Sequence, residues 1–148
     1  VFMKIYIITS LIVLIAISNV AVADDVITPS KISKEDISGK IFERETIVTT
    51  HHGGSTQLDA QTLEGKDRKF ESGMYQSGPI RQVIQEPYGV DEFMYFIKGS
   101  VTLTSSDGSV QTINAGEAVS IPKEWTGIWQ TEGYTKFYAI YYPEGLPE

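Results

Sequence analysis

The chain has 148 residues, and its 12 Lys and Arg against 19 Asp and Glu give a formal net charge of −7. This length suits one globular domain, and the acidic balance disfavours nucleic acid as a partner. Cysteine is absent and only His51 and His52 are present, which excludes disulfides, thiolate metal sites and a three-histidine metal centre within one chain.

Residues 1–23 have the layout of a secretory signal. Lys4 precedes an apolar run from Ile5 to Ile17, and Ala21-Val22-Ala23 supplies the small residues at which signal peptidase cleaves. We predict cleavage after Ala23, giving a periplasmic or secreted protein without stable membrane insertion. The alternative is an uncleaved membrane anchor, since the segment is nearly long enough to span a bilayer. Polar residues interrupt that segment, however, and no basic cluster follows it.

Residues 24–64 are predicted to form an N-terminal arm and the first strand. Residues 24–45 are polar and charged with weak helical periodicity, so we expect them to lie against the domain as an arm. Residues 46–54 are rich in β-branched side chains and end in two glycines, which is typical of a short strand before a turn. Residues 55–68 show no clear pattern and are predicted to be a loop.

From residue 69 onwards the sequence predicts a β protein. Turn signals such as Asp107-Gly108 separate the β-rich runs, and seven or eight short strands without a long helix indicate a sandwich or a barrel. The runs are Lys69–Tyr75, Ile80–Gln85, Glu92–Leu103, Val110–Ile113, Ala118–Ile121, Ile128–Thr131 and Thr135–Tyr142.

Two segments carry a resemblance to a known family. Asp91-Glu92-Phe93 leads to Gly99, and Gly116-Glu117 leads to Pro122 and then Gly127-Ile128-Trp129. These motifs resemble the cupin superfamily, and within it the small group of the ureidoglycine aminohydrolase cupin domain and the EutQ-like proteins. The resemblance covers residues 65–143 and implies an all-β, single-domain cupin, a double-stranded β-helix or jelly-roll barrel. Residues 144–148 would form a C-terminal tail.

The resemblance also implies where a cupin metal site would lie. Most cupins hold a divalent metal with two histidines in an H-x-H motif, a glutamate and a later histidine, and the glutamate matches Glu92. The histidine positions are occupied by Glu86 and Tyr88 or, with a longer gap, by Gln85 and Pro87, and finally by Gly127. Because a transition metal needs three or four converging ligands, we predict no tightly held metal and no other cofactor.

Two further sets of residues have weaker functional indications. Neighbouring residues of a strand point to opposite faces, so at most one of His51 and His52 enters the barrel. We interpret both as surface residues. Arg81 is out of phase with Ile80 and Gln82, and we interpret it as a rim or surface residue rather than an anion-binding one.

Glu92 is the predicted chemical centre. Strand alternation places Glu92, Met94 and Phe96 on one face, and a carboxylate that lies among apolar side chains inside a barrel is poised for proton transfer unless it is paired or hydrogen-bonded. One interpretation makes Glu92 and Tyr88 catalytic, and the other makes Glu92 purely structural. We expect Glu92→Gln to change stability little, and to abolish ligand binding if a ligand binds there.

Aromatic residues are dense in the second half of the chain. Trp129 shares strand parity with Gly127, so we expect Trp129 to face the barrel where the missing glycine side chain leaves room. Aromatic walls with carboxylates suit a small uncharged or cationic organic ligand. The predicted ligand-binding residues are Glu86, Glu92, Trp125, Trp129 and Tyr138.

The sequence is compatible with three functions. The first is an exported protein that binds a small polar molecule in the barrel, and the second is a small-molecule hydrolase or lyase with Glu92 as general acid or base. The third is a non-catalytic interaction protein with a closed barrel. Because exposed sheet edges favour pairing, we also predict a homodimer in which the arm of residues 24–45 is exchanged.

Overall fold

The computed structural model describes residues 27–147 of the chain. The predicted signal sequence, residues 1–23, lies outside the described residues. Within them, no helix is long and apolar enough to cross a membrane. The elements are the α-helix α1 (Lys34–Ser38), the 3-10 helix η1 (Lys40–Glu43) and the strands β1 (Val48–His52), β2 (Ser55–Glu64), β3 (Phe70–Ser77), β4 (Ile80–Ile84), β5 (Asp91–Ser105), β6 (Val110–Asn114), β7 (Ala118–Ile121) and β8 (Gly127–Tyr141).

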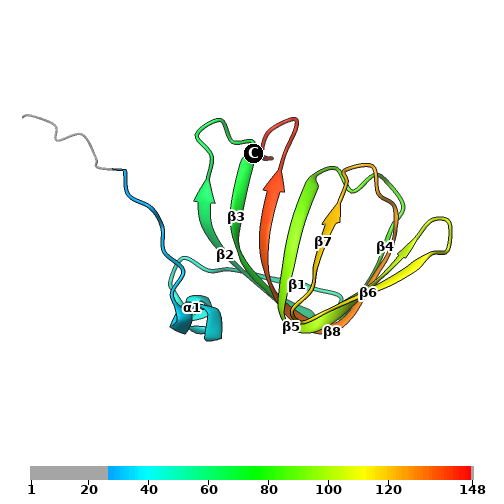
Figure 1. Ribbon diagram of the computed structural model, residues 1–148, viewed down its shortest axis with the longest axis horizontal. Helices are drawn as coiled ribbons and strands as arrows, with labels where there is room; N and C mark the ends of the chain where they lie inside the picture. Colours follow the sequence, from blue (N-terminus) through cyan, green and yellow to red (C-terminus); the bar gives the residue numbers. More distant parts are fainter. Residues whose placement is uncertain (1–26, 148) are drawn as a thin grey trace, which may run out of the picture.

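The eight strands of the described residues form one antiparallel sheet that bends back on itself (Figure 1). The strand order is β1-β2-β3-β8-β5-β6, with β4 paired to the first part of β8 and β7 paired to the first part of β5. The 15-residue strands β5 and β8 run through the bend and connect its two sides. The predicted all-β, single-domain jelly roll is therefore confirmed.

The bend lies where two glycines of β5 and β8 approach each other. Gly99 has a φ of +70°, and a Cβ on it would lie 2.0 Å from the carbonyl oxygen of Gly133. Gly133 itself has a φ of +127°, and the strand register shifts nearby. Only glycine fits such a position. The break expected near residue 133 is therefore a bulge inside one continuous strand, not a turn between two.

The prediction of a loop over residues 55–68 is wrong, because β2 spans Ser55–Glu64. This strand pairs with β1 on one side and β3 on the other. Its inward-facing residues include Gln57 and Asp59, both of which line the interior cavity. Because both faces of β2 carry polar residues, the alternation of apolar and polar side chains that normally identifies a strand is missing.

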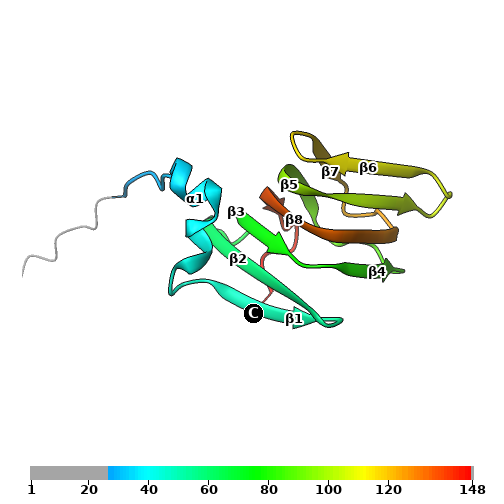
Figure 2. The same ribbon diagram turned by 90° about the horizontal axis from the view of Figure 1, so that it is seen from below.

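The N-terminal arm lies against the outside of the sheet, as predicted. Ser33 and Asp36 form a reciprocal capping box at the start of α1. The side chain of Ile41 is fully buried with Ala60 of β2 and Met74 of β3 in a small apolar cluster. Figure 2 shows α1 outside the sheet, beside β2 and β3. The arm therefore covers part of the outer face of its own barrel.

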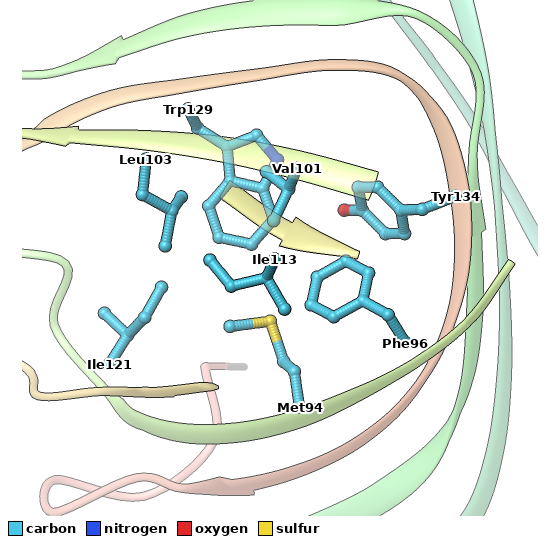
Figure 3. Close-up of a cluster of buried hydrophobic side chains, with 8 residues drawn as sticks. All are labelled: Met94, Phe96, Val101, Leu103, Ile113, Ile121, Trp129 and Tyr134. Carbon is cyan, nitrogen blue, oxygen red and sulfur yellow. The ribbon is translucent and has the colours of Figure 1, made fainter. Parts of the chain in front are cut away.

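The main apolar core is a cluster of side chains from one part of the barrel (Figure 3). Its side chains come from β5, β6, β7 and β8 and point toward one another. Met94 and Phe96 are fully buried, so the predicted inward face of β5 is confirmed. The cluster consists of Met94, Phe96, Val101, Leu103, Ile113, Ile121, Trp129 and Tyr134. Trp129 and Tyr134 also line the cavity, so they form the boundary between the apolar core and the polar interior.

Candidate functional site

A cavity of about 790 Å³ lies inside the barrel beside the core. Strands β1, β2, β3, β4 and β8 contribute to its wall, together with residues 85–88 and Glu92. Its volume is within the range of small-molecule binding sites. Six aromatic side chains line it: Tyr75, Tyr88, Trp129, Tyr134, Tyr138 and Tyr142.

A buried ion pair forms the centre of this site. The Nζ of Lys136 lies 2.6 Å from Oε1 of Glu92, and the two side chains are 7% and 3% exposed. The hydroxyl of Tyr88 donates to the other oxygen of Glu92 at 2.5 Å. Both oxygens of the carboxylate are thus hydrogen-bonded, which offsets the cost of burying its charge.

Lys136 is a candidate site residue that was not identified from the sequence. It lies on β8 opposite Phe96 of β5, and its Nζ lies 5.3 Å from the ring centre of Trp129 and 5.5 Å from that of Tyr75. Aromatic faces at such distances stabilise an ammonium group. Lys136 has the same strand parity as Tyr138, which was assigned to the pocket, and this parity could have identified it.

The tyrosines around the ion pair are neutral side chains. Burial, together with the charge of Glu92, raises the pKa of Tyr88 well above its usual value of 10. Burial also raises the pKa of Tyr75 to about 12. The ring of Tyr88 stacks on Trp129, with an interplanar angle of 7° and 6.5 Å between ring centres. These phenols therefore remain protonated at neutral pH.

A second group of carboxylates lines the cavity on β2 and β3. Asp59 accepts a hydrogen bond from the hydroxyl of Tyr138 at 2.8 Å. Glu71 accepts one from Tyr142 at 2.5 Å and another from Gln61 at 2.7 Å. Burial raises the pKa of Asp59, the hydrogen bond from Tyr138 opposes this rise, and the nearby charge of Glu71 adds to it. Neither carboxylate was predicted from the sequence to belong to the site.

The structure brings most of the predicted site residues together. Glu92, Tyr88, Trp129 and Tyr138 line the cavity, and the exposed Glu86 lies at its rim. Trp125 does not belong to the lining. Its ring packs edge-on against Tyr88 and its Nε1 donates to Ser105 Oγ at 3.1 Å, so it supports the wall from behind.

Gly127 does not open space in the cavity, contrary to the prediction. A Cβ at this position would lie 2.2 Å from the carbonyl oxygen of Thr104 and 2.7 Å from the ring of Trp125. The glycine instead allows β8 to pass close to β5. A histidine that could bind a metal would have no room for its side chain at this position. Glu92 is already paired with Lys136, and no group of three or more His, Asp or Glu in residues 27–147 is placed to hold a metal ion. The residues at the cupin metal positions therefore do not fit a metal.

The histidines and Arg81 lie at the surface. His52 faces the cavity at its exposed edge, whereas His51 points away and its Nδ1 lies 3.1 Å from Thr56 Oγ1. The prediction that at most one histidine faces the barrel is therefore confirmed. Arg81 is exposed and does not line the cavity, in agreement with its interpretation as a rim or surface residue.

Comparisons with known proteins agree with this architecture. A family model described as the EutQ-like cupin domain matches residues 64–138, while none of the curated proteins matches. A DUF861-family protein of unknown function from Pseudomonas syringae pv. tomato, whose structure has been solved, is 21% identical to this chain, with a TM-score of 0.58. The match covers 64% of this chain and 43% of that protein.

Two further solved structures have the same fold. The EutQ protein of Clostridium difficile is 16% identical, with a TM-score of 0.50, and the match covers 64% of this chain and 68% of EutQ. The cupin domain of Schizosaccharomyces pombe Cnp3 is 9% identical, with a TM-score of 0.50, and the match covers 66% of this chain and 69% of that domain. At these identities the likeness concerns the fold alone.

Proposed function

The chain belongs to the EutQ-like cupin domain family, and we propose that it binds a small polar organic molecule in its barrel without a tightly held metal. The observation that carries this proposal is the cavity of about 790 Å³, in whose wall Lys136 and Tyr88 are both hydrogen-bonded to Glu92. A few fixed polar groups among aromatic walls are the usual composition of a small-molecule site.

The distribution of apolar and polar residues supports binding over a closed barrel. The apolar core occupies the part of the interior between β5, β6, β7 and β8, whereas the cavity beside β1, β2, β3 and β4 is lined by carboxylates, an ammonium group and phenols. Buried polar groups add little to stability compared with apolar packing. Their concentration around a cavity therefore favours a role in recognition.

The contacts of Glu92 favour binding over acid–base catalysis. Its two oxygens already accept hydrogen bonds from Lys136 and Tyr88, so Glu92 positions these two groups. Lys136 and Tyr88 themselves line the cavity. We therefore place the hydrolase or lyase with Glu92 as general acid or base second to a binding protein. We also propose that the protein acts outside the cytoplasm, after removal of residues 1–23.

The proposed function is tested with a panel of small amines, amides and sugar acids. Melting temperatures are measured for the parent and for the double variant Glu92→Gln/Lys136→Met, which removes both charges of the ion pair together and so leaves no unpaired buried charge. Glu124→Gln/Lys123→Met is the matched control, because it removes an exposed pair of the same two residue types.

A compound at 100 times its dissociation constant should stabilise the parent and the control by about 2.7 kcal/mol. The double variant should show no stabilisation by the same compound. The proposed function is wrong if no class of compound stabilises the parent, and the site is wrong if the double variant responds equally.

A further inference from the structure

The cavity holds more negative than positive charge. Among the described residues that line it, the charged groups are the carboxylates Asp59, Glu71, Glu86 and Glu92 and the ammonium of Lys136. Glu92 and Lys136 neutralise each other at 2.6 Å. Asp59 and Glu71 take part in no ion pair of the described residues.

These two carboxylates lie in the wall of the cavity. Glu71 is 9% exposed, and Asp59 is half-buried. The hydroxyl of Tyr138 donates to one oxygen of Asp59. The hydroxyl of Tyr142 and the side-chain amide of Gln61 donate to the two oxygens of Glu71. These neutral donors supply no opposite charge. An uncompensated charge in a partly buried site is costly, and a cation that entered the cavity would remove this cost.

Gln57 provides an independent indication of a ligand. Its side chain lines the cavity and is only 4% exposed, yet its Nε2 has no hydrogen-bond partner. Gln57 precedes Asp59 by two residues on β2 and shares its face, so their Cα atoms lie about 7 Å apart. A buried donor without an acceptor costs free energy. An acceptor on a ligand would satisfy it.

The geometry favours an organic cation over a metal ion. Asp59 and Glu71 do not belong to any cluster of His, Asp or Glu in residues 27–147 that could coordinate a metal. Tyr75 lies directly across from Asp59 in the β2–β3 pairing and also lines the cavity. An aromatic ring next to a carboxylate suits an ammonium or guanidinium group, which interacts with both.

We propose that the ligand is an amine or guanidine whose charged group binds at Asp59 and Glu71 and whose hydrogen-bond acceptor meets Nε2 of Gln57. This inference rests on the proposed binding function and specifies its ligand class. The chain should therefore prefer a cationic ligand to a neutral or anionic one, and a ligand that carries a hydrogen-bond acceptor at its other end to one that lacks it.

Four compounds with the same five-carbon chain test the charge and the acceptor separately. They are 5-aminopentanamide, a cation with an amide acceptor; pentylamine, a cation without one; pentanamide, which is neutral; and glutaramate, an anion. Titration calorimetry with the purified chain should give an affinity for 5-aminopentanamide at least ten times that for pentanamide, with glutaramate weakest. Pentylamine should bind more weakly than 5-aminopentanamide, because it leaves Gln57 unsatisfied.

Three variants assign these preferences to residues. Asp59→Asn should lower the affinity for 5-aminopentanamide at least tenfold and leave the affinity for pentanamide unchanged. The control Glu132→Gln removes an exposed charge outside the cavity and should change neither affinity. Gln57→Leu removes the unpaired donor without leaving a polar group behind, so it should fold. It should also abolish the preference for 5-aminopentanamide over pentylamine.

The outcomes separate this inference from the proposed function. Equal or tighter binding of pentanamide or glutaramate, or an unchanged affinity in Asp59→Asn, overturns the cation assignment. So does a lack of binding by all four compounds when a neutral or acidic member of the wider panel binds. If no compound of any class stabilises the chain, the binding function itself fails.

Discussion

Glu92 and Lys136 form a buried charge pair, and each residue depends on the other. Removing only one partner leaves the other as an unpaired buried charge, which typically costs about 3–5 kcal/mol. We predict losses of this size in the free energy of unfolding for Glu92→Gln and for Lys136→Met, and a much smaller loss for the double variant. Urea denaturation of the three variants gives the coupling energy. Additive single losses would show that the pair does not act as a unit.

This ion pair reverses the expectation that Glu92→Gln costs little stability. That expectation followed from a carboxylate without a charged partner. Strand alternation correctly identified the inward face of β5, since the apolar residues Met94 and Phe96 mark it. The residue type of Lys136 gave no indication that it faces inward, because a single lysine on a strand is ordinarily exposed. A partner that lies 44 positions away in sequence becomes visible only when β5 and β8 are paired.

Asp59 links recognition to the pH dependence of stability. Burial raises the pKa of Asp59 in the folded state above the value of 3.8 expected for the unfolded chain, so its ionised form destabilises the fold at neutral pH. This cost disappears as pH falls through the raised pKa, because the folded state then binds the proton first. The pKa of Asp59 is raised further by the charges of Glu71 and Glu92. It is lowered by the hydrogen bond from Tyr138 and by the charge of Lys136.

We therefore predict that Asp59→Asn raises the melting temperature at pH 7. The gain should shrink as the pH falls through the raised pKa of Asp59 and should vanish below 3.8, where Asp59 becomes protonated in both the folded and the unfolded parent. Thermal melts of parent and variant across this range measure the gap. A gap that widens on acidification would contradict the assigned direction of the pKa shift.

At the scale of the elements, the bend in β5 and β8 depends on a close backbone approach at Gly99. We predict that Gly99→Ala lowers the free energy of unfolding by about 3 kcal/mol or more. The new Cβ would clash with the carbonyl oxygen of Gly133, and the alanine would also have to adopt a positive φ. Gly108→Ala is the matched control, since it also has a positive φ but no atom within 4 Å of its Cβ. It should cost about 1–2 kcal/mol, and equal losses would show that the contact is unimportant.

The elements differ in how visible they were in the sequence. The hairpin at Asp107-Gly108 was predicted and joins β5 to β6, because its turn residues and the flanking alternation are local signals. β2 was missed because its inner face carries Gln57 and Asp59 instead of apolar side chains. The polar residues that hid the strand are the same ones that make the candidate ligand site, so function obscured the fold signal.

At the scale of the whole molecule, export is the first property to test. The predicted mature chain begins at Asp24, after the apolar segment of residues 5–17. N-terminal sequencing of protein recovered outside the cytoplasm should start at this residue. A chain that begins at Met3 and stays in the membrane fraction would support the membrane anchor instead.

The outer face of the sheet offers a second route to the predicted homodimer, besides exchange of the arm. In the single chain, Ile41 of the arm is fully buried against its own barrel. The outer face of β5 and β8 exposes Phe93, Tyr95 and Tyr141 by 50%, 41% and 47%. Asp91 pairs with Tyr141 and Phe93 with Ala139, so these apolar residues lie on neighbouring strands. An exposed apolar patch of this kind is typical of an interaction surface.

We propose that the chain forms a two-fold homodimer through this face. Light scattering at micromolar concentration should give twice the chain mass, and Phe93→Lys should give a monomer, because a charge directly at a two-fold interface faces its own copy. Val110→Lys is the control: Val110 is a similarly exposed apolar residue, 61% accessible, and it lies on β6 outside the patch. This variant should remain dimeric. A monomer mass for the parent excludes the dimer, and a dimer that survives Phe93→Lys excludes this face as its interface.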